Sequence, residues 1–190
     1  MSLQLKKTGL YNDWLSFAAN QSIVECDFFD LKEGPVNELL GDFSSERLTA
    51  FGEHASGSLL SFYSKIADAN VNEVPVAWLD SEGAPCIVVS NNLQDFFSIL
   101  PYGMGFIYSV ASVIENNLNE ADLLAKTKQR ITQNADELLE TSKKRFLDVD
   151  DLLTWLNSKN IKLSSDPVTA IVEAHERNSD LTSWIVEKLI

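Results

Sequence analysis

The sequence predicts an α+β fold in which short strands are combined with helices. Two observations lead to this prediction. Runs of β-prone residues separated by turn residues occupy the middle of the chain, and apolar residues at helical spacings of three and four occur before and after them. A length of 190 residues with 45% hydrophobic content is typical of a folded chain with a sizeable core.

The first predicted element is a helix over residues 10–20, because its apolar side chains recur at spacings of three and four. Residues 21–30 mix β-branched and aromatic residues with acids, and no element is assigned to them. The pair Gly34–Pro35 interrupts the chain, and residues 36–40 are predicted to form a short turn or helix.

Three strands are predicted next. Small residues that include Gly57 form a turn that enters a strand over residues 59–63. Residues 74–80 and 86–90 are the second and third strands, and the short turn between them contains Gly83, which is expected to supply a positive φ. The last two strands are therefore predicted to form a β-hairpin.

Helices follow the hairpin. Asn91 and Asn92 are expected to cap a helix over residues 93–100, because an Asn side chain accepts the free N–H groups of a first turn. A proline stops this helix, and Gly103 lies in the exit turn. Residues 106–118 then show helical spacing again.

The remainder of the chain is predicted to be helical. One charged helix carries a narrow apolar stripe with a period of seven, formed by Leu124, Ile131 and Leu138. Shorter helices are expected to begin at Asp148, at Ser165–Pro167, where a capping side chain precedes a proline, and at Asp180.

The charge of the chain restricts its partners. The formal net charge is −13, and residues 1–118 carry 15 acidic against 5 basic side chains, whereas residues 119–190 carry 13 against 10. This charge repels phosphate backbones and anionic lipid, so we expect neither a nucleic-acid nor a membrane partner. The acidity either keeps the protein soluble or attracts a basic partner.

The location of the chain is predicted from what its sequence lacks. There is no apolar run of the roughly 18 residues that a membrane span needs, and no apolar segment follows the charges at the N-terminus. We therefore expect a cytoplasmic protein in which Cys26 and Cys86 are buried, reduced thiols.

The motifs of catalysis and metal binding were searched for and not found. The sequence has no nucleophile elbow, no Walker-type loop and no dinucleotide fingerprint. Neither His54 beside Glu53 nor His175 beside Glu176 has metal-ligand spacing, and residues 148–151 lack the glycine of a calcium loop. We expect no metal, no cofactor and no catalytic residue.

Four segments carry a resemblance to a known family. They are Gly57–Tyr63 (GSLLSFY), Pro75–Gly83 (PVAWLDSEG), Val88–Leu100 (VVSNNLQDFFSIL) and Tyr102–Gly103. In order and content they resemble the SUKH superfamily, which unites the Smi/Knr-like, Syd-like and US22-like proteins. The resemblance is sharpest over residues 56–103.

The resemblance implies an α+β domain over residues 1–118, with a mixed or antiparallel sheet and helices packed on it. Residues 119–190 are then a C-terminal helical extension packed on that core. It also implies a protein-recognition module, because many bacterial members resemble immunity proteins that neutralise toxins, and others are regulatory scaffolds. The first fifty residues lack the acidic and aromatic segment with paired glycines that is often found early in this family.

The turn of the hairpin is the strongest local indication of a binding surface. Asp80 and Glu82 either face water while Trp78 packs in the core, or they also form part of a partner-binding surface to which Tyr63 contributes. Structural roles in turns or caps are assigned to Gly57, Gly83, Asn91 and Gly103.

Three functions are weighed. The first is an immunity-type protein that binds and blocks a basic toxin. The second is an intracellular scaffold or regulatory adaptor, whose tail over residues 119–190 makes a separate contact. The third is a small-molecule binder or enzyme with a cleft lined by Trp78, Tyr63 and acids. A monomer or weak homo-oligomer is expected.

Overall fold

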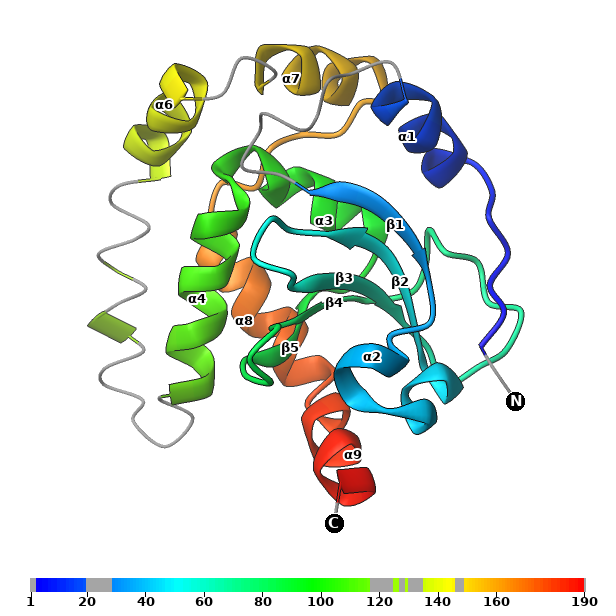
Figure 1. Cartoon of the computed structure of the whole chain (residues 1–190). Coiled ribbons are helices and arrows are strands. Elements are labelled where there is room, and N and C mark those ends of the chain that lie inside the picture. The colour runs from blue at the N-terminus through cyan, green and yellow to red at the C-terminus, as the bar shows by residue number, and fades with distance from the viewer. Residues whose placement is uncertain are drawn as a thin grey trace.

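The chain forms one antiparallel sheet with helices packed around it (Figure 1). The structure is a computed structural model, and it describes residues 3–19, 29–116, 125–126, 129, 135–145 and 149–189. The described residues form five strands and eight α-helices, so the predicted α+β class is confirmed. The strands follow the order β1-β2-β3-β4-β5 across the sheet.

The bounds of the elements are as follows. The strands are β1 (Asp30–Gly34), β2 (Leu48–Glu53), β3 (Leu59–Tyr63), β4 (Val76–Leu79) and β5 (Cys86–Ser90). The helices are α1 (Leu10–Ala18), α2 (Asn37–Leu40), α3 (Leu93–Ile99), α4 (Met104–Asn116), α6 (Ala135–Arg145), α7 (Val149–Ser158), α8 (Pro167–Arg177) and α9 (Asp180–Leu189).

Strands β3, β4 and β5 are buried along their whole length. Every residue of β3, β4 and β5 is buried, and alternate side chains enter two separate hydrophobic clusters. On β4, for example, Trp78 belongs to one cluster and Leu79 to the other. A strand that is buried on both faces has a continuous apolar sequence, which explains why these three strands were predicted.

One face of the sheet is covered by helices from both halves of the chain. Side chains of α1, α3, α4 and α7 share one cluster with the sheet, and Figure 1 shows these helices around that side. Its aromatic centre joins Trp14 of α1 to Phe97 of α3, with ring centroids 4.8 Å apart, and Phe97 to Trp155 of α7, 5.2 Å apart. The C-terminal helix α7 is therefore part of the core.

The opposite face is covered chiefly by α2 and α9. Trp184 of α9 is 5% exposed and lies 5.4 Å from Phe43, and the guanidinium of Arg47 lies 4.9 Å above its ring. At the start of α9, Asp180 accepts a hydrogen bond from the hydroxyl of Tyr63. It also forms an ion pair with Lys65 at 2.8 Å. The last helix is thus tied to the sheet by both apolar and charged contacts.

Helix α8 lies against β5 and contributes to both clusters. Val168 and Ile171 enter the first cluster, and Ala174 enters the second. Because β5 is the last strand of the sheet, α8 covers an edge that would otherwise expose apolar side chains and unpaired backbone groups. The helix start predicted at residues 165–167 is confirmed, and its cap is Asp166, which accepts a hydrogen bond from the Thr169 N–H at 3.0 Å.

Two strands were not predicted, and one cap differs. Strand β1 is almost fully exposed and has the sequence DLKEG, while β2 is interrupted by Gly52 at a register shift. The N-cap of α3 is Asn92, which accepts the Asp95 N–H at 2.8 Å, and not Asn91, whose side chain accepts a hydrogen bond from Asn178. Either of two neighbouring asparagines can cap a helix, and the backbone angles that decide between them cannot be predicted from the sequence.

The glycines assigned to turns have the expected backbone angles. Gly57, Gly83 and Gly103 have φ values of +85°, +95° and +91°. Cys86 is a buried free thiol. Cys26 and the apolar stripe of the charged helix (Leu124, Ile131 and the side chain of Leu138) lie outside the described part of the structure.

In the described residues, no single helix combines the length and apolar composition that crossing a membrane requires. One bent pair, Leu93–Tyr102 with Met104–Asn116, meets the length and composition test only when both halves are taken together, and the two halves meet at 107°.

Replacing Trp184 with alanine should uncover one face of the sheet. We expect Trp184→Ala to lower the free energy of unfolding by about 3–5 kcal/mol in urea denaturation, because a buried aromatic side chain is lost. Val186→Ala on the same helix is the control: Val186 is 50% exposed, so its loss should change stability by less than ~0.5 kcal/mol. Equal effects of the two variants would show that α9 is not docked as described.

The buried His175 should make stability depend on pH. Burial lowers the pKa of His175, with Glu176 acting in the opposite direction, so the folded state favours the neutral ring. The unfolded chain therefore binds more protons below about pH 6.5, and the free energy of unfolding should fall as the pH drops from about 7.5 to about 5.5. Urea titrations of His175→Gln should show a smaller fall, and parallel profiles would contradict this.

Candidate functional site

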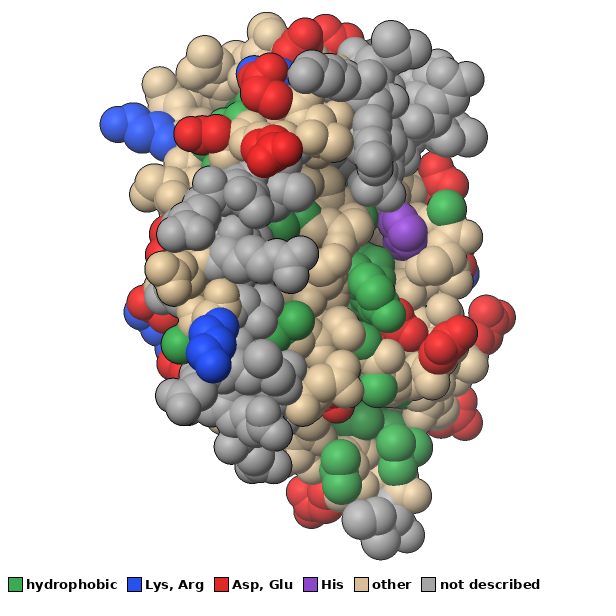
Figure 2. Space-filling model, turned by 90° about the vertical axis from the view of Figure 1, so that its left-hand side faces the viewer, with side chains coloured by type: hydrophobic (Ala, Val, Ile, Leu, Met, Phe, Trp, Pro, Cys, Tyr) green, Lys and Arg blue, Asp and Glu red, His purple; other side chains and the backbone are tan. Residues whose placement is uncertain are grey.

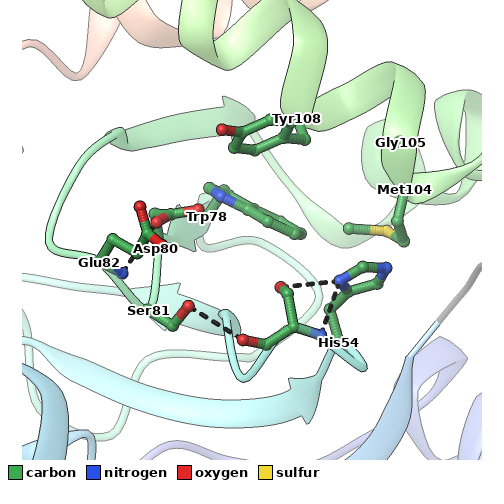
Figure 3. Close-up of a pocket in the computed structure, with 9 residues that line it drawn as sticks. His54, Trp78, Asp80, Ser81, Glu82, Met104, Gly105 and Tyr108 are labelled. Carbon is green, nitrogen blue, oxygen red and sulfur yellow. Dashed lines mark hydrogen bonds between the residues drawn. The ribbon is translucent and has the colours of Figure 1, made fainter.

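Two hairpin turns and helix α4 enclose a cleft at one end of the sheet. We call it the hairpin cleft; its volume is about 360 Å³. The turn between β2 and β3 forms one side, the turn between β4 and β5 forms another, and the first two turns of α4 complete it (Figure 3). Its lining residues are His54, Ser56, Trp78, Asp80, Ser81, Glu82, Met104, Gly105 and Tyr108.

The turn between β2 and β3 is fixed by hydrogen bonds within it and to the neighbouring turn. The N–H of Gly57 donates to the carbonyl of His54 at 2.8 Å, and the positive φ of Gly57 allows this tight bend. The hydroxyl of Ser81 donates to the Ser56 carbonyl at 3.0 Å. The two hairpin turns are therefore joined directly, and the cleft has a defined shape in the free protein.

Asp80 organises the second turn. One of its carboxylate oxygens accepts the Glu82 N–H at 2.9 Å and the other accepts the Ser58 hydroxyl at 3.3 Å. Its carbonyl accepts the Gly83 N–H at 3.0 Å, which closes a β-turn around the positive φ of Gly83. Asp80 is only 7% exposed, whereas Glu82 lies exposed beside it.

Neither carboxylate of this turn has a cationic partner within the described chain. The ion pairs among those residues involve other acids, such as Glu33, Glu53 and Asp180, and none includes Asp80 or Glu82. A carboxylate that is nearly buried without a counter-charge loses hydration that a salt bridge would replace. The cleft consequently has an uncompensated negative charge at its inner end.

Aromatic side chains form the other walls. Trp78 is 1% exposed, and its ring centroid lies 6.1 Å from that of Tyr108 and 5.8 Å from that of His54. Tyr108 is 42% exposed on the surface of α4. Figure 3 shows Tyr108 over Trp78, with Met104 and His54 at one end of the indole and Asp80 and Glu82 at the other.

The surface around α4 has mixed chemistry. On the described part of the face seen in Figure 2, hydrophobic side chains lie next to a histidine and several carboxylates. Carboxylates next to aromatic rings favour a cation, which gains charged hydrogen bonds and contacts with the rings together.

The polar groups of the cleft do not form a nucleophile and base arrangement. His54 Nδ1 and the Ser56 hydroxyl are 2.9 Å apart, but this contact spans two residues of one tight turn. Asp80 contacts the hydroxyl of Ser58 and not the imidazole of His54, so it does not orient a base as the acid of a catalytic triad does. Across the described chain, no three His, Cys, Asp or Glu side chains are grouped closely enough to hold a metal ion.

The structure brings together three of the four residues that were predicted to bind a partner. Trp78, Asp80 and Glu82 line the cleft, whereas Tyr63 lies under α9 with its hydroxyl bonded to Asp180. Burial, followed by that hydrogen bond, raises the pKa of Tyr63 to about 12. Tyr63 is 2% exposed, and it anchors the last helix.

His54, Met104 and Tyr108 were missed as cleft residues. Met104 and Tyr108 reach the site because α4 packs across two turns that are distant from it in sequence, and His54 reaches it because the turn between β2 and β3 lies beside the turn between β4 and β5. Helical spacing identified the α4 segment, but it gives no information on which turn of the sheet lies beneath the exposed ring of Tyr108.

Comparisons with protein-family models, with curated proteins and with solved structures found no match to this chain. The resemblance to the SUKH superfamily therefore stays a prediction.

Two substitutions of Asp80 should separate its charge from its role in the turn. Asp80→Asn keeps an acceptor for the Glu82 N–H, and its amide can donate to the Ser58 hydroxyl, so stability should change by less than ~0.5 kcal/mol. Asp80→Ala removes the acceptor of the Glu82 N–H and one of the two acceptors of the Ser58 hydroxyl, and should cost about 1–3 kcal/mol. Urea denaturation measures both, and an equally large loss in Asp80→Asn would mean that the fold itself requires the charge.

Proposed function

We propose that this chain is a non-catalytic protein-binding module that binds a basic partner, as an immunity-type protein does when it neutralises its toxin. The observation that carries the proposal is the carboxylate of Asp80, which is held nearly buried in an aromatic cleft without a cation. A cationic group from a partner would form charged hydrogen bonds with this carboxylate on binding, and the buried aromatic surroundings would limit competition from water.

The charge distribution supports a basic partner. Residues 1–118, which include the whole cleft, carry 15 acidic and only 5 basic side chains. A surface of one sign steers a partner of the opposite sign and raises its association rate, an effect that salt weakens. An inhibitor of a cationic toxin needs fast association of this kind.

The rim of the cleft suits a protein partner. Ser56, Ser81, Glu82, Gly105 and Tyr108 are exposed around it, while Trp78, Asp80 and Met104 are buried beneath. Exposed polar groups around a pocket suit a protein partner that inserts one anchoring side chain.

A second function, that of an adaptor, is favoured by one observation on the last helix. Val186 and Leu189 of α9 are 50% and 64% exposed, and together they offer a small apolar contact. Because α8 and α9 also complete the core, deleting the tail would unfold the sheet rather than remove a contact alone. Substitution of these two residues with serine is the suitable test of an adaptor.

The binding experiment compares charge-matched variants. The tagged full-length chain is used to capture proteins from cells that naturally express it, with low-salt and high-salt washes. We expect wild type to retain a stoichiometric, basic protein whose binding is weakened by salt. Asp80→Asn/Glu82→Gln should bind this protein at least about tenfold more weakly, which corresponds to ~1.4 kcal/mol. Glu38→Gln/Glu187→Gln removes the same charge from exposed sites on α2 and α9 and should behave as wild type.

Protection of cells is the second measurement. Co-expression of the purified partner's gene should be toxic, and wild type but not the cleft variant should relieve that toxicity. A captured protein that is neutral, insensitive to the cleft variant and lost with Val186→Ser/Leu189→Ser would contradict the inhibitor and support the adaptor.

A further inference from the structure

We propose that the hairpin cleft is a receptor for one arginine side chain of the partner. Its guanidinium would bind Asp80 and Glu82, and its aliphatic stem would lie along Trp78 and Tyr108. This inference rests on the proposed function for its partner, but it concerns a site that can be tested without one.

The carboxylates provide the charge and the acceptors. Each oxygen of Asp80 accepts one hydrogen bond within the protein, so each keeps a further lone pair for a donor. Glu82, exposed next to it, adds a second carboxylate at the mouth. A planar guanidinium has five N–H donors and can bind carboxylates through paired hydrogen bonds, which a compact ammonium group cannot do.

The walls fit the rest of the side chain. A volume of about 360 Å³ is near the lower end of the usual range for ligand pockets, which suits a single side chain. Tyr108 is one of the few large hydrophobic side chains that are exposed in the described structure, and it lies directly over Trp78. Tyr108 can contact the methylene stem and the face of a guanidinium, and rotation of its exposed ring would bring the buried Trp78 ring into the same contact.

The chain contains the same arrangement with its cation present. On the opposite face of the sheet, the guanidinium of Arg47 lies 4.9 Å above the Trp184 ring and 3.8 Å from an Asp180 oxygen. The hairpin cleft repeats the tryptophan and the aspartate, as Trp78 and Asp80, within a few residues of each other. The described residues place no arginine beside this second pair, so a partner has to supply it.

The indole nitrogen of Trp78 adds a requirement for an acceptor. It is buried and has no hydrogen-bond partner among the described residues, and Figure 3 shows it at the end of the ring nearer Asp80 and Tyr108. An arginine within a peptide brings a main-chain carbonyl together with its cation. Rotation of the exposed Tyr108 ring would let this carbonyl accept the N–H, which favours a peptide over a free cation.

The test is a titration followed by NMR of the ¹⁵N-labelled full-length chain. The probes are N-acetyl-arginine N-methylamide, the corresponding lysine compound, and the uncharged citrulline compound. The readout is the indole N–H resonance of Trp78, assigned by its loss in Trp78→Phe or, if that variant does not fold, by through-bond experiments on wild type. One side chain should bind with a dissociation constant on the order of 1–10 mM.

We expect a saturable shift of the Trp78 resonance with arginine, a weaker effect with lysine and none with citrulline. Asp80→Asn/Glu82→Gln should abolish the shift, and Glu38→Gln/Glu187→Gln should leave it intact. No shift up to about 50 mM arginine, or an equal shift with citrulline, would overturn the inference. If arginine shifts the resonance but no basic protein is captured, the inhibitor function is rejected and the arginine site is kept. If a basic protein is captured but arginine causes no shift, only the arginine site is rejected.

Discussion

The structure depends on the burial of both faces of its sheet. Strands β3, β4 and β5 expose no residue, because α1, α3, α4 and α7 cover one face, α2 and α9 cover the other, and α8 covers the β5 edge. These three strands can present side chains to a partner only where they end, although the edge strand β1 is exposed. The two turns that meet beside α4 are such ends, and their mutual hydrogen bonds give them a fixed shape.

Two aspartates have different surroundings in this fold. The carboxylate of Asp180 is satisfied by Lys65 and Tyr63; although burial acts in the opposite direction, these bonds hold its pKa below the ordinary value. Asp80 is more deeply buried and is bonded only to neutral donors. Asp180 therefore has its cation within the chain, whereas Asp80 has none among the described residues, and this difference is what the proposal of a basic partner uses.

The sequence was sufficient for the elements that carry a strong local pattern. The hairpin of β4 and β5, the Asp166 cap and the positive φ of Gly83 followed from apolar runs and turn chemistry. Strand β1 was missed because it has no apolar run. It is held in the sheet by backbone pairing with β2. The cleft was predicted in part: Trp78, Asp80 and Glu82 are close in sequence, whereas Tyr108 joins them only through the packing of α4. A tyrosine is common in binding surfaces, so sequence alone did not distinguish Tyr63 from a binding residue. The position of α9 shows that Tyr63 anchors this helix.

Hydrogen–deuterium exchange of the full-length chain, alone and with its purified partner, tests the central claim most directly. The account predicts that the partner slows exchange in the two hairpin turns, residues 54–58 and 80–85, and at the start of α4. It also predicts that Asp80→Asn, which keeps the turn, loses this protection. Protection confined to α9 or to β1, with the hairpin turns unchanged, would contradict the assignment of the cleft as the binding site.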